Sequence, residues 1–201
     1  AVQGYEKTPD GGIKVLLKGS DPISADFVVL SVGVAPETHL AEEAGLQLGM
    51  KKSILTDEHM RTSDENIYAV GDAVCVKNFV SGREALIALA GPANKQGRIA
   101  ADNICGISSS FTGSQGSSVI KLFDMTAAST GLNEKTAKAA DITYDKVFTF
   151  SASHATYYPG ASNMTIKTLF CPDTGRILGA QIVGFEGVDN RIDAFKTYDL
   201  R

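Results

Sequence analysis

A Ser/Gly-rich stretch near the middle of the chain, SSSFTGSQGSS, separates two segments of different pattern. Before it, short apolar runs alternate with helical periodicity. After it, strand-like segments and a hairpin signal dominate. Glycine and serine at this density favour a loop over a helix or a strand. The sequence therefore predicts an α/β segment followed by an α+β segment, with the boundary at about residue 115.

The first segment begins with two strand-like runs, IKVLLKG (13–19) and DFVVLSVG (26–33). The turn signals PDGG and GSDP flank the first run and separate it from the second. Because a hairpin alone buries too little surface to be stable, residues 1–32 are expected to belong to a sheet whose other strands lie elsewhere. A short helix is expected over PETHLAEEAG, ending at Gly45.

Composition excludes several classes of function. The 201 residues carry a net charge of −4, and their lysines and arginines are dispersed, so neither nucleic acid nor an anionic membrane is an expected partner. No apolar run approaches the ~20 residues that cross a bilayer. The three cysteines lie far apart, and the three histidines do not cluster with them, which predicts no metal site and a reduced, cytoplasmic compartment. The cysteines, expected to be small core residues, are Cys75, Cys105 and Cys171.

The stretch NIYAVGDAV ends an apolar run, Ile67–Val70, abruptly at Gly71 and Asp72. An ionised aspartate offers only hydrogen-bond acceptors, which suits a hydroxyl-rich ligand. A preceding glycine lets such a ligand approach the backbone. Ligands of open α/β folds gather at the carboxyl ends of strands, where this pair is expected. On the dipeptide alone, a plain turn or a helix N-cap is the stronger interpretation.

The longest helical segment is REALIALAGPANKQGRIAADNICG, and it contains Gly91 and Pro92. Proline is well tolerated at the first position of a helix, whose free N–H groups suit an anion or an electron-rich carbonyl. The alternative is a proline kink within one helix that runs from Arg83. Spacing alone does not decide between a helix that starts at Gly91 and Pro92 and a kinked helix that runs from Arg83.

The second segment is predicted to be α+β. SVIKLFDMTAASTG and ITYDKVFTFSA are typical of strands, and NEKTAKAAD of a helix with Asn133 as its N-cap. The PDTGR turn between two apolar runs indicates a hairpin. A helix is expected to begin in the final stretch, VDNRIDAFKTYDLR.

Six motifs in order resemble those of the flavin-dependent pyridine nucleotide–disulfide oxidoreductases. They are ADFVVLSVGVAPET, IYAVGDA, GPANKQGRIAADNICG, STGLNEKTAK, HATYYPGA and GRILGAQIVGFEGVDNRID. The resemblance is greatest to the branch of coenzyme A-disulfide reductases and NADH oxidases or peroxidases. It implies that residues 1–32 end an NAD(P)-binding domain, that residues 33–115 are the C-terminal part of a Rossmann-like FAD-binding domain, and that residues 116–201 form a truncated dimerisation domain.

The resemblance also implies roles for residues near the flavin. The Asp72 carboxylate would accept a hydrogen bond from the ribityl chain of FAD, with Gly71 and Ala73 beside it. The helix start at Pro92 and Ala93 would face the pyrimidine edge of the flavin. In this family the dimerisation domain completes the partner's active site, so a homodimer is expected.

Further roles concern the substrate. A tyrosine in HATYYPGA would reach the other subunit's redox cysteine, and a phenol can donate a proton to a leaving thiolate. Either Tyr157 or Tyr158 fits this catalytic role; packing of paired aromatics before a Pro-Gly turn is the alternative. Asn94 and Lys95 lie where this branch contacts coenzyme A, although Lys95 fits a solvated surface position almost equally well.

Two features of the family do not occur in this sequence. There is no GxGxxG fingerprint, and no cysteine lies in a disulfide-reductase motif. The chain is therefore expected to be part of an enzyme that passes electrons from NAD(P)H through FAD and a redox cysteine to a small-molecule disulfide such as coenzyme A disulfide, or to a persulfide. The alternatives are an NADH oxidase or peroxidase and, for the isolated chain, a non-catalytic dimerisation module. The isolated chain is expected to show no turnover and weak or no retention of FAD.

Overall fold

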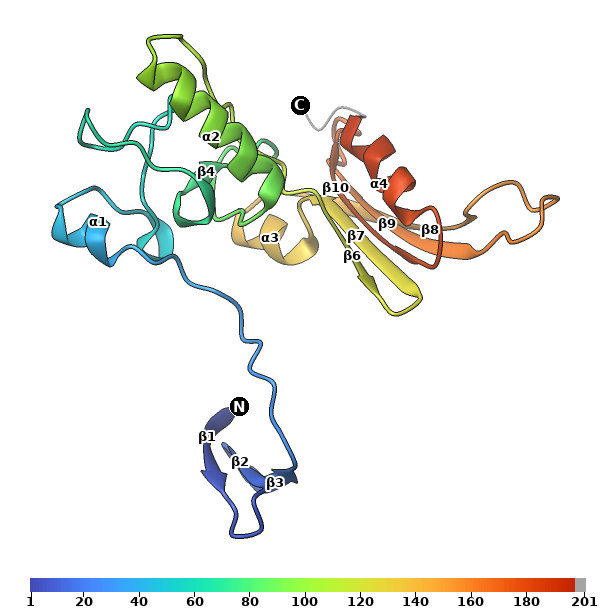
Figure 1. Ribbon diagram of the computed structural model, residues 1–201. Helices are drawn as coiled ribbons and strands as arrows, with labels where there is room; N and C mark the ends of the chain where they lie inside the picture. The colour runs from blue at the N-terminus through green and yellow to red at the C-terminus, as the bar shows by residue number, and fades with distance from the viewer. Residues whose placement is uncertain (198–201) are drawn as a thin grey trace. The chain divides into compact units, whose positions relative to one another are not determined.

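The computed structural model describes residues 1–197 of the chain. The chain divides into two units, Ala1–Ala35 and Pro36–Arg201, each with its own strands (Figure 1). The smaller unit is all β. The larger unit has short mixed elements up to α2 and an antiparallel sheet with two helices after it. This order confirms the predicted α/β segment followed by an α+β segment.

The smaller unit is a three-stranded antiparallel sheet in the order β1-β2-β3. Its strands are β1 (Val2–Lys7), β2 (Ile13–Leu17) and β3 (Ser20–Ala25). The strand expected from Ile13 is confirmed as β2. The PDGG turn before it closes with a hydrogen bond of 3.0 Å from the Gly11 amide to the Thr8 carbonyl. The sequence pattern missed β1 and β3 because almost all of their residues are exposed and leave no apolar periodicity.

Two apolar runs that the sequence predicts to be strands are not strands in the structure. Phe27 and Val32, in the run 26–33, are 76% and 95% exposed. The run Ile67–Val70 makes one isolated antiparallel bridge, between Tyr68 and Arg61, and both of its end residues are exposed. A strand is stable only when a neighbour pairs with its backbone N–H and C=O groups. Within residues 1–197 the run 26–33 has no such neighbour, and the run Ile67–Val70 has only the short pairing around Arg61, so the prediction of two buried strands is wrong.

The first part of the larger unit consists of short elements around one apolar cluster. The cluster contains Met60, Val74, Val76, Ala100 and Phe111. The elements are α1 (His39–Glu43), the 3₁₀ turns η1 (Met50–Lys52) and η2 (Gly71–Ala73), the paired strands β4 (Val76–Lys77) and β5 (Glu84–Ala85), and α2 (Ala90–Ile104). The helix expected before Gly45 is confirmed as α1. Because Ala100 of α2 and Val74 beyond η2 share the cluster, helix and turn lie against each other.

Helix α2 begins later than its periodic sequence suggests. Residues 84–85 form β5, Leu89 is the N-cap, and Pro92 is the third residue of the helix. One kinked helix running from Arg83 is therefore excluded, and proline sits in the first turn, where its missing N–H costs nothing. The helix ends at Ile104, and Gly106 follows with φ +79°, as expected for a helix stop.

The last part of the larger unit is a five-stranded antiparallel sheet in the order β6-β7-β10-β9-β8. Its strands are β6 (Ser118–Leu122), β7 (Met125–Gly131), β8 (Asp145–Ala152), β9 (Asn163–Phe170) and β10 (Ile177–Gly184). Helix α4 (Val188–Thr197) packs on one face, where Ile192 meets Ile166 and Ile182. The expected strands, the β9–β10 hairpin and the final helix are confirmed.

Helix α3 (Glu134–Ala139) follows β7 and has a capping box. The Thr136 amide donates to Asn133 Oδ1 at 3.0 Å, and the Asn133 amide donates to Thr136 Oγ1 at 2.9 Å. Asn133 as the N-cap is therefore confirmed. The capped start places the next residue, Glu134, toward the sheet.

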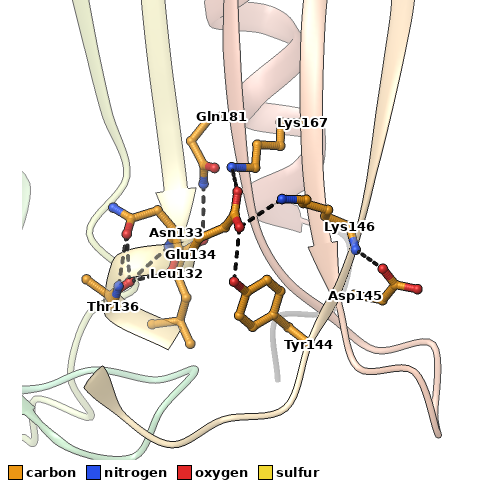
Figure 2. A network of polar contacts seen from close by, with 9 residues as sticks. All are labelled: Leu132, Asn133, Glu134, Thr136, Tyr144, Asp145, Lys146, Lys167 and Gln181. Carbon is orange, nitrogen blue, oxygen red and sulfur yellow. Dashed lines mark hydrogen bonds and ion pairs between the residues drawn. The ribbon is translucent and has the colours of Figure 1, made fainter. Parts of the chain in front are cut away.

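Glu134 is the centre of a polar network that joins α3 to β8 and β9 (Figure 2). Lys167 of β9 donates to one carboxylate oxygen. Lys146 of β8 donates to the other at 2.9 Å, and the Tyr144 hydroxyl donates to it at 3.0 Å. These donors, Lys167 first, lower the pKa of Glu134 from 4.5 to about 2. The network therefore stabilises the fold only while the carboxylate is ionised.

We expect this contribution to be complete above pH 4.5 and to be lost as pH falls from 4.5 to about 2. In that range the unfolded chain binds the Glu134 proton more tightly than the folded chain does. Glu134→Gln cannot titrate, so the difference in unfolding free energy between wild type and this variant should shrink on acidification. Urea unfolding from about pH 6 to about pH 2 measures it. Glu186→Gln, at an exposed carboxylate, is the control; a pH-independent difference for Glu134→Gln would contradict the expectation.

Candidate functional site

The Gly71–Asp72 turn lies at the end of the extended run Ile67–Val70, as the 3₁₀ turn η2. Gly71 has φ +82°, a conformation that side chains other than glycine rarely adopt. A Cβ at this position would meet no atom within 4 Å, so the space beside the turn is open. The Asp72 side chain is exposed and has no hydrogen bond or ion pair to any residue among 1–197. Its acceptor sites are therefore available to a ligand.

Two contacts hold this turn in place. The Gly71 amide donates to Oε1 of Gln96 at 2.7 Å. Gln96 lies in the second turn of α2 and is 1% exposed. On the other side, the Ala73 carbonyl accepts from the Ile54 amide at 2.9 Å. The turn is thus fixed to both the helix and the preceding extended chain.

The start of α2 has no side-chain cap, because its N-cap is Leu89. Pro92 has no N–H, and Asn94 donates its Nδ2 to the Ala90 carbonyl at 2.9 Å rather than to a ligand. The first amides of a helix have no partner within the helix, and its dipole adds partial positive charge there. This end of α2 can therefore receive an anion or a carbonyl oxygen.

A cavity of about 810 Å³ lies beside α2. Its lining includes Pro92 and Lys95 of the helix and the chain from Phe111 to Ser117. Asp72 does not line it, and neither does Gln96, which faces the turn. The structure thus brings Gly71, Asp72 and Ala73 close to α2 but places Lys95 at a different side of the helix.

Tyr157 and Tyr158 lie in the loop between β8 and β9, which Figure 1 shows extending from the end of the sheet, away from α2. They are 82% and 62% exposed, and their ring centroids are 4.8 Å apart at 42°. The loop is closed by the Ser153 amide, which donates to the Ser162 carbonyl at 2.8 Å. The tyrosines therefore do not meet the Asp72 turn within one chain.

The three cysteines are free. Cys75 is buried as expected, but Cys105 is exposed and Cys171 is half-buried, so the expected core position is wrong for these two. Burial raises the pKa of the Cys75 thiol, and hydrogen bonds from the Thr174 hydroxyl and nearby backbone lower the pKa of Cys171. Residues 1–197 contain no group of three or more metal-ligating side chains. No helix described in that range has the length and apolar character of a bilayer-spanning segment.

Sequence reasoning missed Gln96, the residue that fixes the turn. The sequence feature that could have identified Gln96 is a polar side chain four residues after Pro92, on the side of α2 that the turn covers. That side cannot be identified from the sequence because the apolar run before Gly71 forms no regular strand.

Two family models match most of the chain. The model of the pyridine nucleotide-disulphide oxidoreductases matches residues 1–97, and the model of the dimerisation domain of the same family matches residues 117–198. The first contains the Asp72 turn and the start of α2, and the second contains the whole five-stranded sheet.

Individual proteins are similar over the same range. An NAD(P)H sulfur oxidoreductase (CoA-dependent) of Pyrococcus abyssi is 38% identical over 85% of this chain and 38% of its own length. An NADH oxidase of Methanocaldococcus jannaschii is 39% identical over 84% of this chain and 37% of its own length. The structure of an NAD-dependent persulfide reductase from A. fulgidus has a TM-score of 0.92 and 39% identity, covering 98% of this chain and 37% of that one. The chain thus spans about two fifths of the length of these proteins.

Replacing Gln96 tests whether the helix fixes the turn. We expect Gln96→Leu, similar in volume, to lower the free energy of unfolding by about 1–3 kcal/mol, because the Gly71 amide loses its acceptor. Urea unfolding monitored by circular dichroism measures this loss. Arg98→Leu, on an exposed position of the same helix, should change stability by less than about 0.5 kcal/mol. Equal effects of the two substitutions would argue against a specific role for the hydrogen bond.

Proposed function

Because this chain belongs to the pyridine nucleotide-disulphide oxidoreductases, we propose that its parent protein passes electrons from NAD(P)H through FAD to a disulfide. FAD held at the Asp72 turn would supply hydride and electron transfer between the nicotinamide and a redox cysteine, a role that the family motifs assign to none of the three cysteines in this sequence. This chain contributes the flavin anchor and a subunit contact. The acceptor we propose is coenzyme A disulfide or a persulfide.

The observation that carries the proposal is the exposed carboxylate of Asp72, which has no partner among residues 1–197, beside the uncapped start of α2. Asp72 would accept a hydrogen bond from a ribityl hydroxyl, with the backbone of Gly71 and Ala73 close to the chain of the cofactor. The open space around Gly71 suits such an approach. The start of α2 at Pro92 and Ala93 would face the electron-rich pyrimidine edge of the flavin, where the partial positive charge of the helix dipole favours it.

Asn94 and Lys95 are proposed to contact coenzyme A. Lys95 lines the cavity beside α2, where its ammonium group can pair with a phosphate. The P. abyssi relative is named a CoA-dependent sulfur oxidoreductase and the A. fulgidus structure a persulfide reductase, which supports this class of acceptor. The M. jannaschii relative, an NADH oxidase, supports the alternative of an oxidase or peroxidase.

The parent is proposed to be a homodimer in which Tyr157 or Tyr158 acts at the partner's active site. Both phenols are highly exposed on a loop that lies away from α2 of their own chain. A phenol placed near a leaving thiolate can donate its proton. The three free cysteines fit a reducing compartment, and we propose a cytoplasmic location.

The first test concerns the flavin anchor. In the parent protein, we expect Asp72→Asn to lower the FAD content of purified protein at least about tenfold, since a charged acceptor contributes roughly 1.5–3 kcal/mol. Flavin absorbance per polypeptide measures it. Glu65→Gln, at another exposed carboxylate, should leave the content unchanged. The isolated chain should retain little or no FAD; a stoichiometric yellow complex would contradict that expectation.

The second test concerns the acceptor. NADH and NADPH oxidation by the parent protein should be fastest with coenzyme A disulfide or a persulfide and much slower with peroxide or oxygen. Tyr157→Phe and Tyr158→Phe, assayed separately, should show which phenol acts: one should lower kcat by about 100-fold, the general acid contribution, and the other by much less. Preference for oxygen or peroxide would support the oxidase alternative instead.

A further inference from the structure

The hairpin of β4 and β5 joins the segment that carries the Asp72 turn to the core under the C-terminal sheet. Only Val74 and Cys75 separate the turn η2 from β4. At the tip of the hairpin, residues 78–83, Val80 is 7% exposed and belongs to a second apolar cluster. The other buried residues of this cluster all follow residue 130, and they are Leu132, Ala137, Leu169 and Leu178. Val80 therefore packs into a core that the C-terminal part of the chain builds.

Asn78 gives the tip a defined shape. Its Oδ1 accepts hydrogen bonds from the Val80 and Ser81 amides, both at 3.0 Å. Its carbonyl accepts from the Gly82 amide at 2.9 Å. Asparagine favours turns of this kind because its side chain bonds the backbone two residues further on. Asn78 is itself buried, so the tip presents Val80 to the sheet as a preformed loop.

Two arginines add polar contacts around Val80. Arg176, directly before β10, donates to the Val80 carbonyl at 3.3 Å. Arg83 of the tip donates to the carbonyl of Ala139 in α3 at 3.3 Å and lies 3.6 Å from the Asp141 carboxylate. The pair of Arg83 and Asp141 is exposed, and exposed ion pairs contribute little to stability. Burial of Val80 is therefore the main contribution to this contact.

The hairpin also lies against the chain that leads from α2 to the sheet. The Phe79 amide donates to the Ser114 carbonyl at 3.1 Å, and the Ser114 amide donates to the Lys77 carbonyl at 2.9 Å. Gly113 has φ +110°, and a Cβ there would overlap the Lys77 carbonyl. The hairpin is thus paired along its length and cannot move independently of its tip.

We propose that Val80 is a positioning residue for the Asp72 turn. Gln96 holds the turn from α2 through the Gly71 amide. On the other side of the turn, Val74 and Val76 are buried in the first apolar cluster and connect it to the hairpin. Because close-packed segments transmit displacement rather than absorb it, a tip released from the sheet would loosen the turn. The consequence for FAD rests on the proposed function, but the position of the turn does not.

Hydrogen exchange of the Gly71 amide in this chain, followed by NMR, tests the inference. Val80→Ala removes two buried methyl groups, so we expect this amide to exchange about tenfold faster. Leu169→Val is the control because it trims the same cluster from within the sheet and leaves the hairpin unchanged. It should lower the stability of the fold without changing exchange at Gly71. If Val80→Ala does not fold, Val80→Thr keeps the shape and weakens the contact with a buried hydroxyl.

FAD retention by the parent protein is the second readout. Val80→Ala should lower the flavin absorbance per polypeptide, and Leu169→Val should not, although both variants are less stable than wild type. Unchanged exchange at Gly71 in the Val80 variant, or an equal rise in Leu169→Val, would overturn the inference. Faster exchange at Gly71 with unchanged FAD retention would support Val80 as a positioning residue and count against the Asp72 turn as the flavin anchor.

Discussion

The hydrogen bond from the Gly71 amide to the buried side chain of Gln96 joins a turn and a helix that are far apart in the sequence. The candidate site depends on it. Asp72 follows Gly71 directly, so the bond that holds the glycine to α2 also sets the position of the carboxylate. Because the start of the same helix has no side-chain cap, one helix fixes the turn and offers its own free amides.

The two parts of the chain differ in how completely their extended segments pair through the backbone. The sheet after residue 117 pairs all five of its strands within the chain and buries one face under α4. The runs at 26–33 and 67–70 are at least as apolar but do not pair in this way within residues 1–197. Near-continuous apolar runs are typical of strands buried on both faces of a parallel sheet. Their exposure here agrees with a chain that spans about two fifths of its relatives.

The lysines of the Glu134 network lie on the face of the sheet opposite α4, where Phe148 and Phe150 are exposed. Glu134 pairs with both Lys146 and Lys167. One acidic side chain therefore ties α3 to β8 and β9 and neutralises two cations on this face. Loss of its ionisation would weaken both contacts.

The sequence by itself determined the class of each half, the antiparallel strands after residue 117, the Asn133 cap and the family motifs, because these follow from local periodicity and short-range hydrogen bonds. It also placed Asp72 after an apolar run, but it did not identify Gln96, the residue that fixes the turn. Only the tertiary structure decided that α2 begins at Ala90, that Gln96 holds Gly71, that Lys95 lies away from Asp72, and that one face of the sheet is open. These depend on which segments meet in three dimensions, and periodicity carries no information on contacts between distant residues.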